Sequence, residues 1–166
     1  MAFTAGQRVT ADALNAEFNR DRMVTQDADQ TVNNSAVLVS SNYLILSVEA
    51  NSSYVFSAFL IHTGPTTADF KYNLLLPSGA LVRQGTWTPV AAVSSTNTTI
   101  AIDALDASTY NSGDLGTGTM VTMRPTGLVV VSTTAGDAVV QFAQGSAVAT
   151  DTVLKTGSWM NLVKRG

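Results

Sequence analysis

Most of the chain alternates apolar and polar residues with a period of two, and this pattern predicts β-strands. The clearest runs are residues 44–48, 53–62 and 98–104. The run 53–62 is apolar on both faces, which is typical of a strand in the middle of a sheet. In total we count about nine or ten short strands, with turn residues every eight to twelve positions. This spacing predicts an all-β chain folded as a single β-sandwich, jelly-roll-like in its arrangement.

The beginning of the chain has a different, helical period. Thr10 can cap a helix, and Leu14 and Phe18, four residues apart, then lie on one face of it. We expect a short N-terminal α-helix of about three turns, which is too short to be stable alone in water. It must therefore lie against its own sandwich or against another chain. Phe3 and Val9 precede it as two further apolar anchors.

These patterns divide the chain into three parts. Residues 1–24 form the expected docking segment with its helix, residues 25–36 are polar and are interpreted as a linker, and residues 37–166 form the sandwich domain. A chain of 166 residues suits one domain of ordinary size. Residues 105–119 form the one long loop we expect, and such loops tend to be functional or flexible.

Composition suggests a subunit of an assembly. Only 13% of the residues are charged, about half the usual share, and this leaves little to oppose self-association. A merely neutral soluble domain remains the alternative. The net charge of −3 and the scattered Lys and Arg argue against nucleic-acid binding. The chain has no cysteine, and we find neither a membrane-spanning apolar run nor a signal peptide, so we expect synthesis in a cytoplasm.

Catalytic and metal-binding residues are sparse. His62 is the only histidine, and we interpret it as a strand-end residue with its polar tip in solvent, neither part of a catalytic triad nor a metal ligand. The pairs Asp27 and Asp29, and Asp103 and Asp106, are interpreted as turn residues and not as a calcium loop. We therefore expect no enzyme activity and no cofactor.

Three aromatic residues could stack on a sugar. Trp87 stands between two threonines in a predicted strand, and Tyr110 lies in the long loop; these two are the candidate glycan contacts. Trp159 is the third aromatic of this kind. The alternative role for all three is packing in the core or between subunits.

The segment Phe3-Thr-Ala-Gly-Gln-Arg-Val9-Thr-Ala-Asp-Ala-Leu14-Asn15 resembles the opening of many small minor tail and fibre-like virion proteins of phages that infect actinobacteria. The C-terminal Lys155-Thr-Gly-Ser-Trp-Met-Asn-Leu-Val163 is similar to the last strand of sandwich domains in the same group. The resemblance implies a virion protein. Its docking to other virion proteins would use Phe3, Val9, Leu14 and Phe18.

Three hypotheses follow from the residues and the resemblance together. The first is a structural virion protein, either a minor tail, short fibre or baseplate component or a capsid decoration or head fibre protein, which forms homo-oligomers with trimers favoured. The second is a glycan-binding module for adhesion to the host surface. The third is a small hydrolase that depends on His62.

Overall fold

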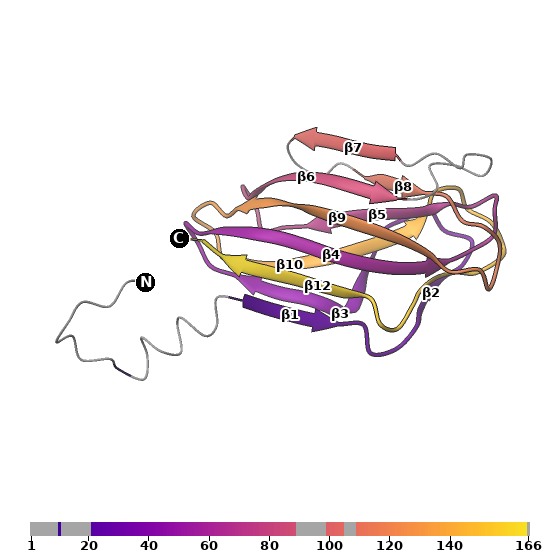
Figure 1. The fold of residues 1–166 in the computed structure, drawn as a ribbon, viewed down its shortest axis with the longest axis horizontal. Helices are drawn as coiled ribbons and strands as arrows, with labels where there is room; N and C mark the ends of the chain where they lie inside the picture. Colours follow the sequence, from indigo (N-terminus) through magenta and orange to yellow (C-terminus); the bar gives the residue numbers. More distant parts are fainter. Residues whose placement is uncertain (1–9, 11–20, 89–98, 105–108, 166) are drawn as a thin grey trace.

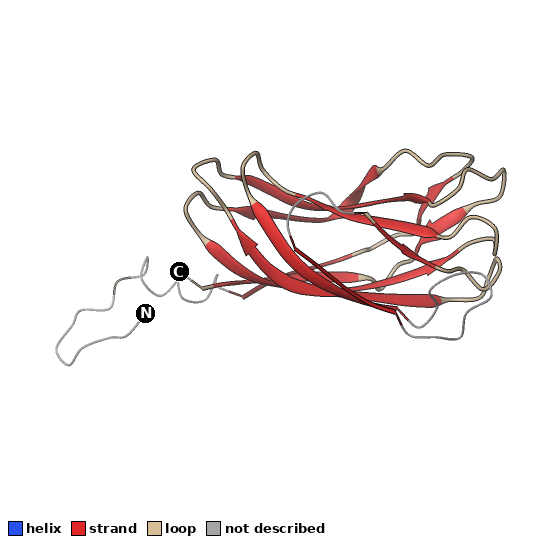
Figure 2. Ribbon diagram, turned by 90° about the horizontal axis from the view of Figure 1, so that it is seen from above, coloured by secondary structure: helices blue, strands red, loops and turns tan. Residues whose placement is uncertain are grey.

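The computed structural model describes residues 10, 21–88, 99–104 and 109–165. These residues form two antiparallel sheets packed face to face as a sandwich (Figures 1 and 2). The described part contains no helix, and hence none long and apolar enough to cross a membrane. The all-β sandwich predicted from the sequence is therefore confirmed. The expected N-terminal helix and its four docking residues lie outside the described residues.

The larger sheet has eight strands, and its main path runs in the order β1–β12–β4–β9–β6–β7. Two further short strands, β11 and β2, pair with each other, and β11 also pairs with the end of β4. The bounds are β1 (Asp21–Thr25), β2 (Gln30–Val32), β4 (Ser53–Thr63), β6 (Leu81–Thr88), β7 (Thr99–Ala104), β9 (Val121–Val130), β11 (Thr152–Leu154) and β12 (Trp159–Lys164).

The smaller sheet has four strands in the order β3–β10–β5–β8. They are β3 (Val39–Val48), β5 (Phe70–Leu75), β8 (Tyr110–Ser112) and β10 (Gly136–Gln144). The register between β3 and β10 shifts between Val139 and Gln141, as at a β-bulge.

Strands that are neighbours in space are mostly far apart in sequence. If β2, β11 and the β6–β7 hairpin are set aside, eight strands remain. Numbered in chain order, they follow 1-8-3-6 in the larger sheet and 2-7-4-5 in the smaller one. The β6–β7 hairpin is thus an insertion that extends the larger sheet beyond β9. The chain crosses repeatedly between the two layers, so the core depends on long-range contacts.

The core lies between the sheets and is built from every second residue of each strand. On β4 the residues Tyr54, Phe56, Ala58 and Leu60 point inward and are buried, while their neighbours point outward. β4 lies between β12 and β9, as its two apolar faces predict. Within the core the Tyr72 hydroxyl donates to Gln84 Oε1 at 3.2 Å, and burial raises the pKa of Tyr72 well above its usual value.

The sandwich begins earlier in the chain than residue 37. All but the last residue of β1 belong to the expected docking segment and β2 lies inside the expected linker, yet β1 pairs with β12 and β2 with β11. Both strands are short and have few apolar residues, so their own sequence carries little strand signal. Each strand pairs with the edge of its neighbour and contributes one valine, Val24 or Val32, to the packing of the core. The expected long loop 105–119 is likewise interrupted by β8.

Candidate functional site

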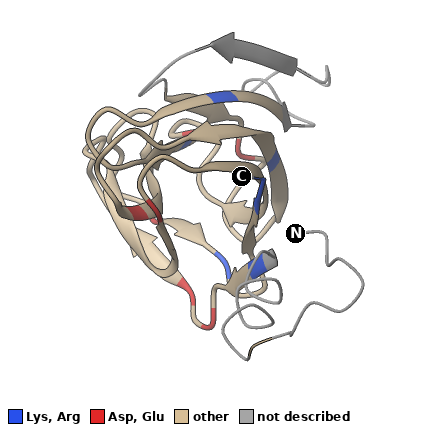
Figure 3. Cartoon of the chain, turned by 90° about the vertical axis from the view of Figure 1, so that its left-hand side faces the viewer, with Lys and Arg blue, Asp and Glu red and all other residues tan. Residues whose placement is uncertain are grey.

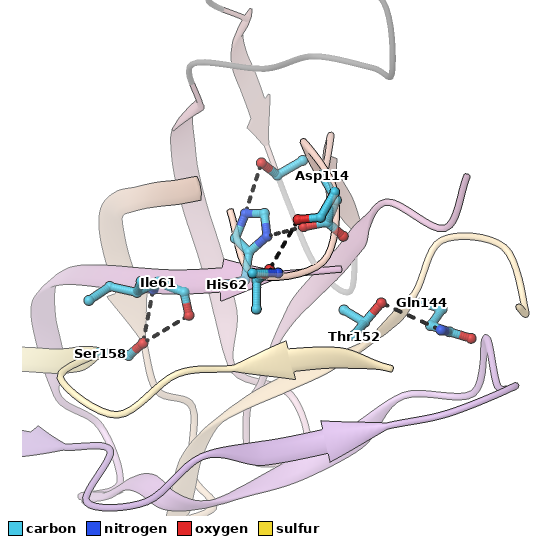
Figure 4. Close-up of polar contacts among 10 residues, drawn as sticks. Ile61, His62, Asp114, Gln144, Thr152 and Ser158 are labelled. Carbon is cyan, nitrogen blue, oxygen red and sulfur yellow. Dashed lines mark hydrogen bonds and ion pairs between the residues drawn. The ribbon is translucent and has the colours of Figure 1, made fainter. Parts of the chain in front are cut away.

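A buried polar cluster lies where β4 ends, at the opposite end of the sandwich from the start of β1 (Figures 1 and 4). His62 Nδ1 lies 2.8 Å from Asp114 Oδ1, and His62 Nε2 lies 3.1 Å from Ser112 Oγ. All three side chains are fully buried. In the tautomer that carries its proton on Nδ1, His62 donates to Asp114 and accepts from the Ser112 hydroxyl at Nε2.

The expectation that the tip of His62 reaches solvent is wrong. His62 continues the inward-facing series of β4, so its ring enters the core and stacks on Phe70, with ring centroids 4.3 Å apart and planes 13° apart. The alternation of β4 in the sequence indicated this inward position, because Tyr54, Phe56 and Leu60 are all an even number of residues before His62. A histidine in that position must find polar partners inside the protein, and Ser112 and Asp114 supply them.

The three residues have the connectivity of a serine nucleophile, a histidine base and an orienting carboxylate. Such chemistry also needs a substrate in contact with the serine oxygen. Here Ser112 has no exposed surface, and none of the three residues lines the groove described below. In this conformation the cluster joins β4 to β8 and to the loop that follows it.

The second carboxylate oxygen of Asp114 is closely surrounded by other atoms. This Oδ2 atom is buried without a hydrogen-bond partner, and the backbone of Gly64 lies close to it. A Cβ atom on Gly64 would lie 2.4 Å from Asp114 Oδ2 and 2.7 Å from Thr152 Oγ1. Only glycine fits between these groups without a shift in the cluster.

Asp69 adds a second carboxylate beside this cluster. Burial raises the pKa of Asp69, and the negative charge of Asp114 raises it further, while the backbone amide of Asp114 and His62 act in the opposite direction. Its Oδ1 atom is buried without a hydrogen-bond partner. The residue also has a positive φ of 56°, a conformation that Asn and Asp tolerate better than most residues.

Other buried polar side chains at this end are well satisfied (Figure 4). Gln144 donates to the Thr150 carbonyl at 2.7 Å and accepts from the amides of Ser35 and Val148. The Ser158 hydroxyl accepts from the Ile61 amide at 2.9 Å. These bonds fix the loops that close the sandwich.

A different kind of site lies on the outer face of the larger sheet. A groove with a cavity volume of about 410 Å³ is lined by Ser57, Ala58, Phe59, Arg124, Thr126 and Trp159. The rings of Phe59 and Trp159 stack with centroids 6.3 Å apart and planes 21° apart. The Arg124 guanidinium lies over the Phe59 ring, 4.9 Å from its centroid.

Strand register explains the shape of this groove. Trp159 pairs with Phe59 across β12 and β4, and this gives an aromatic row. In the next outward row, Asn161, Ser57 and Thr126 are cross-strand partners, so small polar residues form the floor. The row after that contains Val55 and Leu128, which are also partners. The groove thus runs along the row of small polar residues, with the aromatic row on one side and the aliphatic row on the other.

The candidate glycan residues from the sequence have different positions. The side chain of Trp87 lies outside the described part, but its backbone pairs with Arg124, which places Trp87 in register with the aromatic row. Tyr110 is buried, with 8% exposed, and its ring lies 6.3 Å from that of Tyr72. Tyr110 therefore presents no open face to a sugar. Phe59 and Arg124 were not identified from the sequence, because only strand pairing brings them to Trp159.

The acidic pairs do not gather into a site. Asp27 accepts from the Thr25 hydroxyl at 2.9 Å in a turn, and Asp29 bonds to Lys155, which lowers the pKa of Asp29. Asp103 lies near the end of β7, where it pairs with Gln84, and Asp106 lies outside the described residues. Across the described ranges, no three His, Asp or Glu residues lie close enough together to hold a metal ion.

Charged residues are few and scattered along the strands and loops of the sandwich (Figure 3). One exposed ion pair joins Lys164 Nζ to Glu49 Oε2 at 2.6 Å. Exposed pairs of this kind contribute little to stability. The described surface is therefore covered mainly by neutral polar and apolar groups.

Comparison with known proteins gives little resemblance. No protein-family model matches the chain, and no curated protein matches it. Among solved structures, chains from the infectious bursal disease virus Gt strain, the Gx strain and the VP2 subviral particle align with 88% of this chain, at 11%, 12% and 9% identity and TM-scores of 0.22, 0.23 and 0.21. This chain spans about two fifths of the length of those chains, at 42%, 41% and 40%. Alignments with TM-scores this low are not evidence for the fold or the function of this chain.

Proposed function

We propose that the protein is a structural component of a bacteriophage particle, a minor tail, short fibre or baseplate subunit that docks by its N-terminal segment and associates with copies of itself through its sandwich. The observation that carries the proposal is the strand order, 1-8-3-6 in one sheet and 2-7-4-5 in the other. This is the order of a jelly roll, an architecture typical of viral capsid and lectin domains. The β6–β7 hairpin is an addition to it.

The position of the N-terminal segment supports docking. Residues 1–20 of the segment precede β1, the edge strand of the larger sheet. A segment that enters at an edge can bind a neighbouring protein without disturbing the paired strands. The resemblance of residues 3–15 to phage minor tail proteins, with Phe3, Val9, Leu14 and Phe18 as the apolar contacts, points to virion proteins as that neighbour.

The outer face of the smaller sheet supports self-association. Ile45, Val139 and Leu75 are cross-strand partners and form an apolar strip over three strands. Ile45 is 38% exposed and Leu75 is 43% exposed. Beside the strip, Asn73 donates to Gln141 at 3.1 Å and Gln141 donates to Ser40 at 3.3 Å. An apolar strip beside neutral amides suits contact with an identical surface, and we favour a trimer.

The proposal includes no catalysis. Ser112, His62 and Asp114 have the connectivity of a triad but no exposed surface, which favours a structural role. A capsid decoration or head fibre protein is the alternative virion role, since it would use the same docking segment. Localisation of the chain in a particle reconstruction would distinguish the two.

The docking role is tested by removing residues 1–20 from the phage gene. The deletion ends before Asp21 so that β1 remains whole. We expect the shortened protein to fold, with thermal unfolding like that of the full chain, and to be absent from purified particles analysed by mass spectrometry. A point variant, Phe18→Asp, should have the same effect, and the neighbouring Asn19→Asp serves as its control. Particles that still contain the shortened protein at the normal copy number would refute the docking role.

A further inference from the structure

The groove on the larger sheet combines an apolar platform with a polar floor. Its volume of about 410 Å³ falls within the range of about 300–1,000 Å³ that is common for small-molecule sites. Trp159 and Phe59 are both partly exposed, and their stacked rings offer an aromatic surface. Such a surface has a negative face that attracts the weakly positive C–H groups on one side of a sugar ring.

The floor of the groove favours a ligand with hydroxyl groups. Ser57 and Thr126 line it, and both carry hydroxyls that can donate and accept hydrogen bonds. An apolar side chain pressed into the groove would bury these hydroxyls without partners, at a cost of about 1–3 kcal/mol each. A sugar brings hydroxyls of its own and replaces the water that it displaces.

The charge of the groove favours an acidic sugar. Arg124 is the only charged residue among the six that line it. Its guanidinium lies over the ring of Phe59, beside the aromatic platform. A planar guanidinium matches the geometry of a carboxylate or a phosphate.

Single-stranded nucleic acid also binds to aromatic rings and arginine, but it suits this groove less well. Such binding follows a phosphate backbone with several cationic groups. This chain has a net charge of −3, and Arg124 is the one cation that lines the groove. One cation can bind one acidic substituent of a sugar, but it cannot bind the successive phosphates of a single-stranded nucleic acid.

We infer that this groove is a binding site for an acidic carbohydrate, in which a sugar ring packs on Trp159 and Phe59 and its carboxylate or phosphate binds Arg124. The inference is independent of the location of the protein in a particle. Its test can fail while the docking test succeeds, and the reverse is equally true.

The first experiment screens the full-length protein on a glycan array that holds uronate-, sialate- and phosphate-bearing glycans beside neutral oligosaccharides of similar length. We expect binding to members of the acidic set. The strongest acidic glycan and its nearest neutral counterpart are then measured by isothermal titration calorimetry. The wild-type protein should prefer the acidic glycan at least tenfold.

Variants then separate the contributions of the groove residues. Trp159→Ala should weaken binding of both glycans at least tenfold, because the platform is lost. Arg124→Gln should lower the affinity for the acidic glycan to that for the neutral one. Arg83→Gln is the matched control, because it removes the same charge from the same sheet face; Arg83 pairs with Leu128, outside the groove, and its replacement should leave binding unchanged. Thermal unfolding checks that each variant is folded.

Three results would overturn the inference. The first is an array on which no acidic glycan binds the wild-type protein. The second is binding that persists unchanged in the folded Trp159→Ala variant. The third is tighter binding of a short oligothymidylate than of any glycan, with the same loss in Trp159→Ala, since the groove would then be a nucleic-acid site.

Discussion

The Nδ1 atom of His62 lies 2.8 Å from Oδ1 of Asp114, although 52 residues separate the two in sequence and neither side chain reaches solvent. The contact joins the end of β4 to the loop that follows β8. Because Ser112 occupies the second nitrogen of the same ring, the histidine is fully engaged. The end of the sandwich thus depends on one buried polar contact as well as on apolar packing.

Replacement of Asp114 by alanine should destabilise the protein strongly. The change leaves His62 Nδ1 buried without a partner, and removal of one partner of such a buried pair costs about 2–4 kcal/mol. Urea denaturation of wild type and variant measures the difference in the free energy of unfolding. Asp151→Ala is the matched control, because Asp151 is exposed and bonds only to Asn33 among the contacts described. Equal losses in the free energy of unfolding would mean that the buried contact contributes no more to stability than the exposed one.

Asp69→Asn should stabilise the protein at neutral pH. The raised pKa of Asp69 means that the folded state favours its protonated form. The ionised carboxylate therefore costs stability once the pH rises above 3.8, the ordinary pKa of the group, and through its higher pKa in the folded state. Asparagine stays neutral and tolerates the positive φ of this position.

The melting temperature of both proteins across pH 3–8 tests this prediction. The advantage of the asparagine variant should be greatest at neutral pH and should disappear below pH 3.8, where wild-type Asp69 is protonated in both states. The exposed Asp137→Asn serves as the control. A constant difference at all pH values would show that the charge of Asp69 is not the cause.

Gly127→Ala should disrupt the larger sheet. A Cβ atom at this position would lie 2.1 Å from the carbonyl oxygen of Arg83 and 2.7 Å from Cα of Gln84. Both are backbone atoms, so β9 and β6 must move apart, at a cost of about 1–3 kcal/mol or more. Chemical denaturation measures the loss, and the adjacent Thr126→Ala should cost much less. A variant as stable as wild type would show that the two strands separate easily.

Ile45→Lys should break up oligomers of the protein. Burial of an unpaired lysine in a contact between apolar strips is costly. Multi-angle light scattering of the full chain should show a trimer for wild type and a monomer for this variant. Leu128→Lys is the matched control, because Leu128 is 41% exposed on the opposite face, compared with 38% for Ile45. A monomeric wild type at high concentration, or loss of the oligomer only in Leu128→Lys, would contradict the proposed contact surface.

The sequence allowed the layers of the fold to be predicted, but not the contacts between them. The alternation in 53–62 predicts a central strand, and β4 is one. Following the same alternation from Leu60 to the end of this run would have placed His62 inside the core. Nothing in the sequence near residue 62, however, indicates that its partners are Ser112 and Asp114.

The groove shows the same limit. Trp159 was identified from the sequence as an aromatic that could stack on a sugar, but Phe59 and Arg124 are 100 and 35 residues away from it. Their meeting depends on the registers of β12 with β4 and of β4 with β9. Register is determined by packing over the whole sheet, which a local pattern does not contain. The strands β1 and β2 were missed for a related reason, since their pairing partners lie at the far end of the chain.

The pairing of β1 with β12 has a practical consequence for engineering. Asp21 lies opposite Val163, so the first and last strands of the sandwich are direct neighbours. A short linker could join these two ends, and a new break could be opened in the exposed segment 115–120 without the loss of any strand pair. A peptide displayed after β12 would emerge beside the entry of β1. A peptide inserted at 115–120 would project from the other end of the body, so the two sites offer opposite poles for the attachment of cargo.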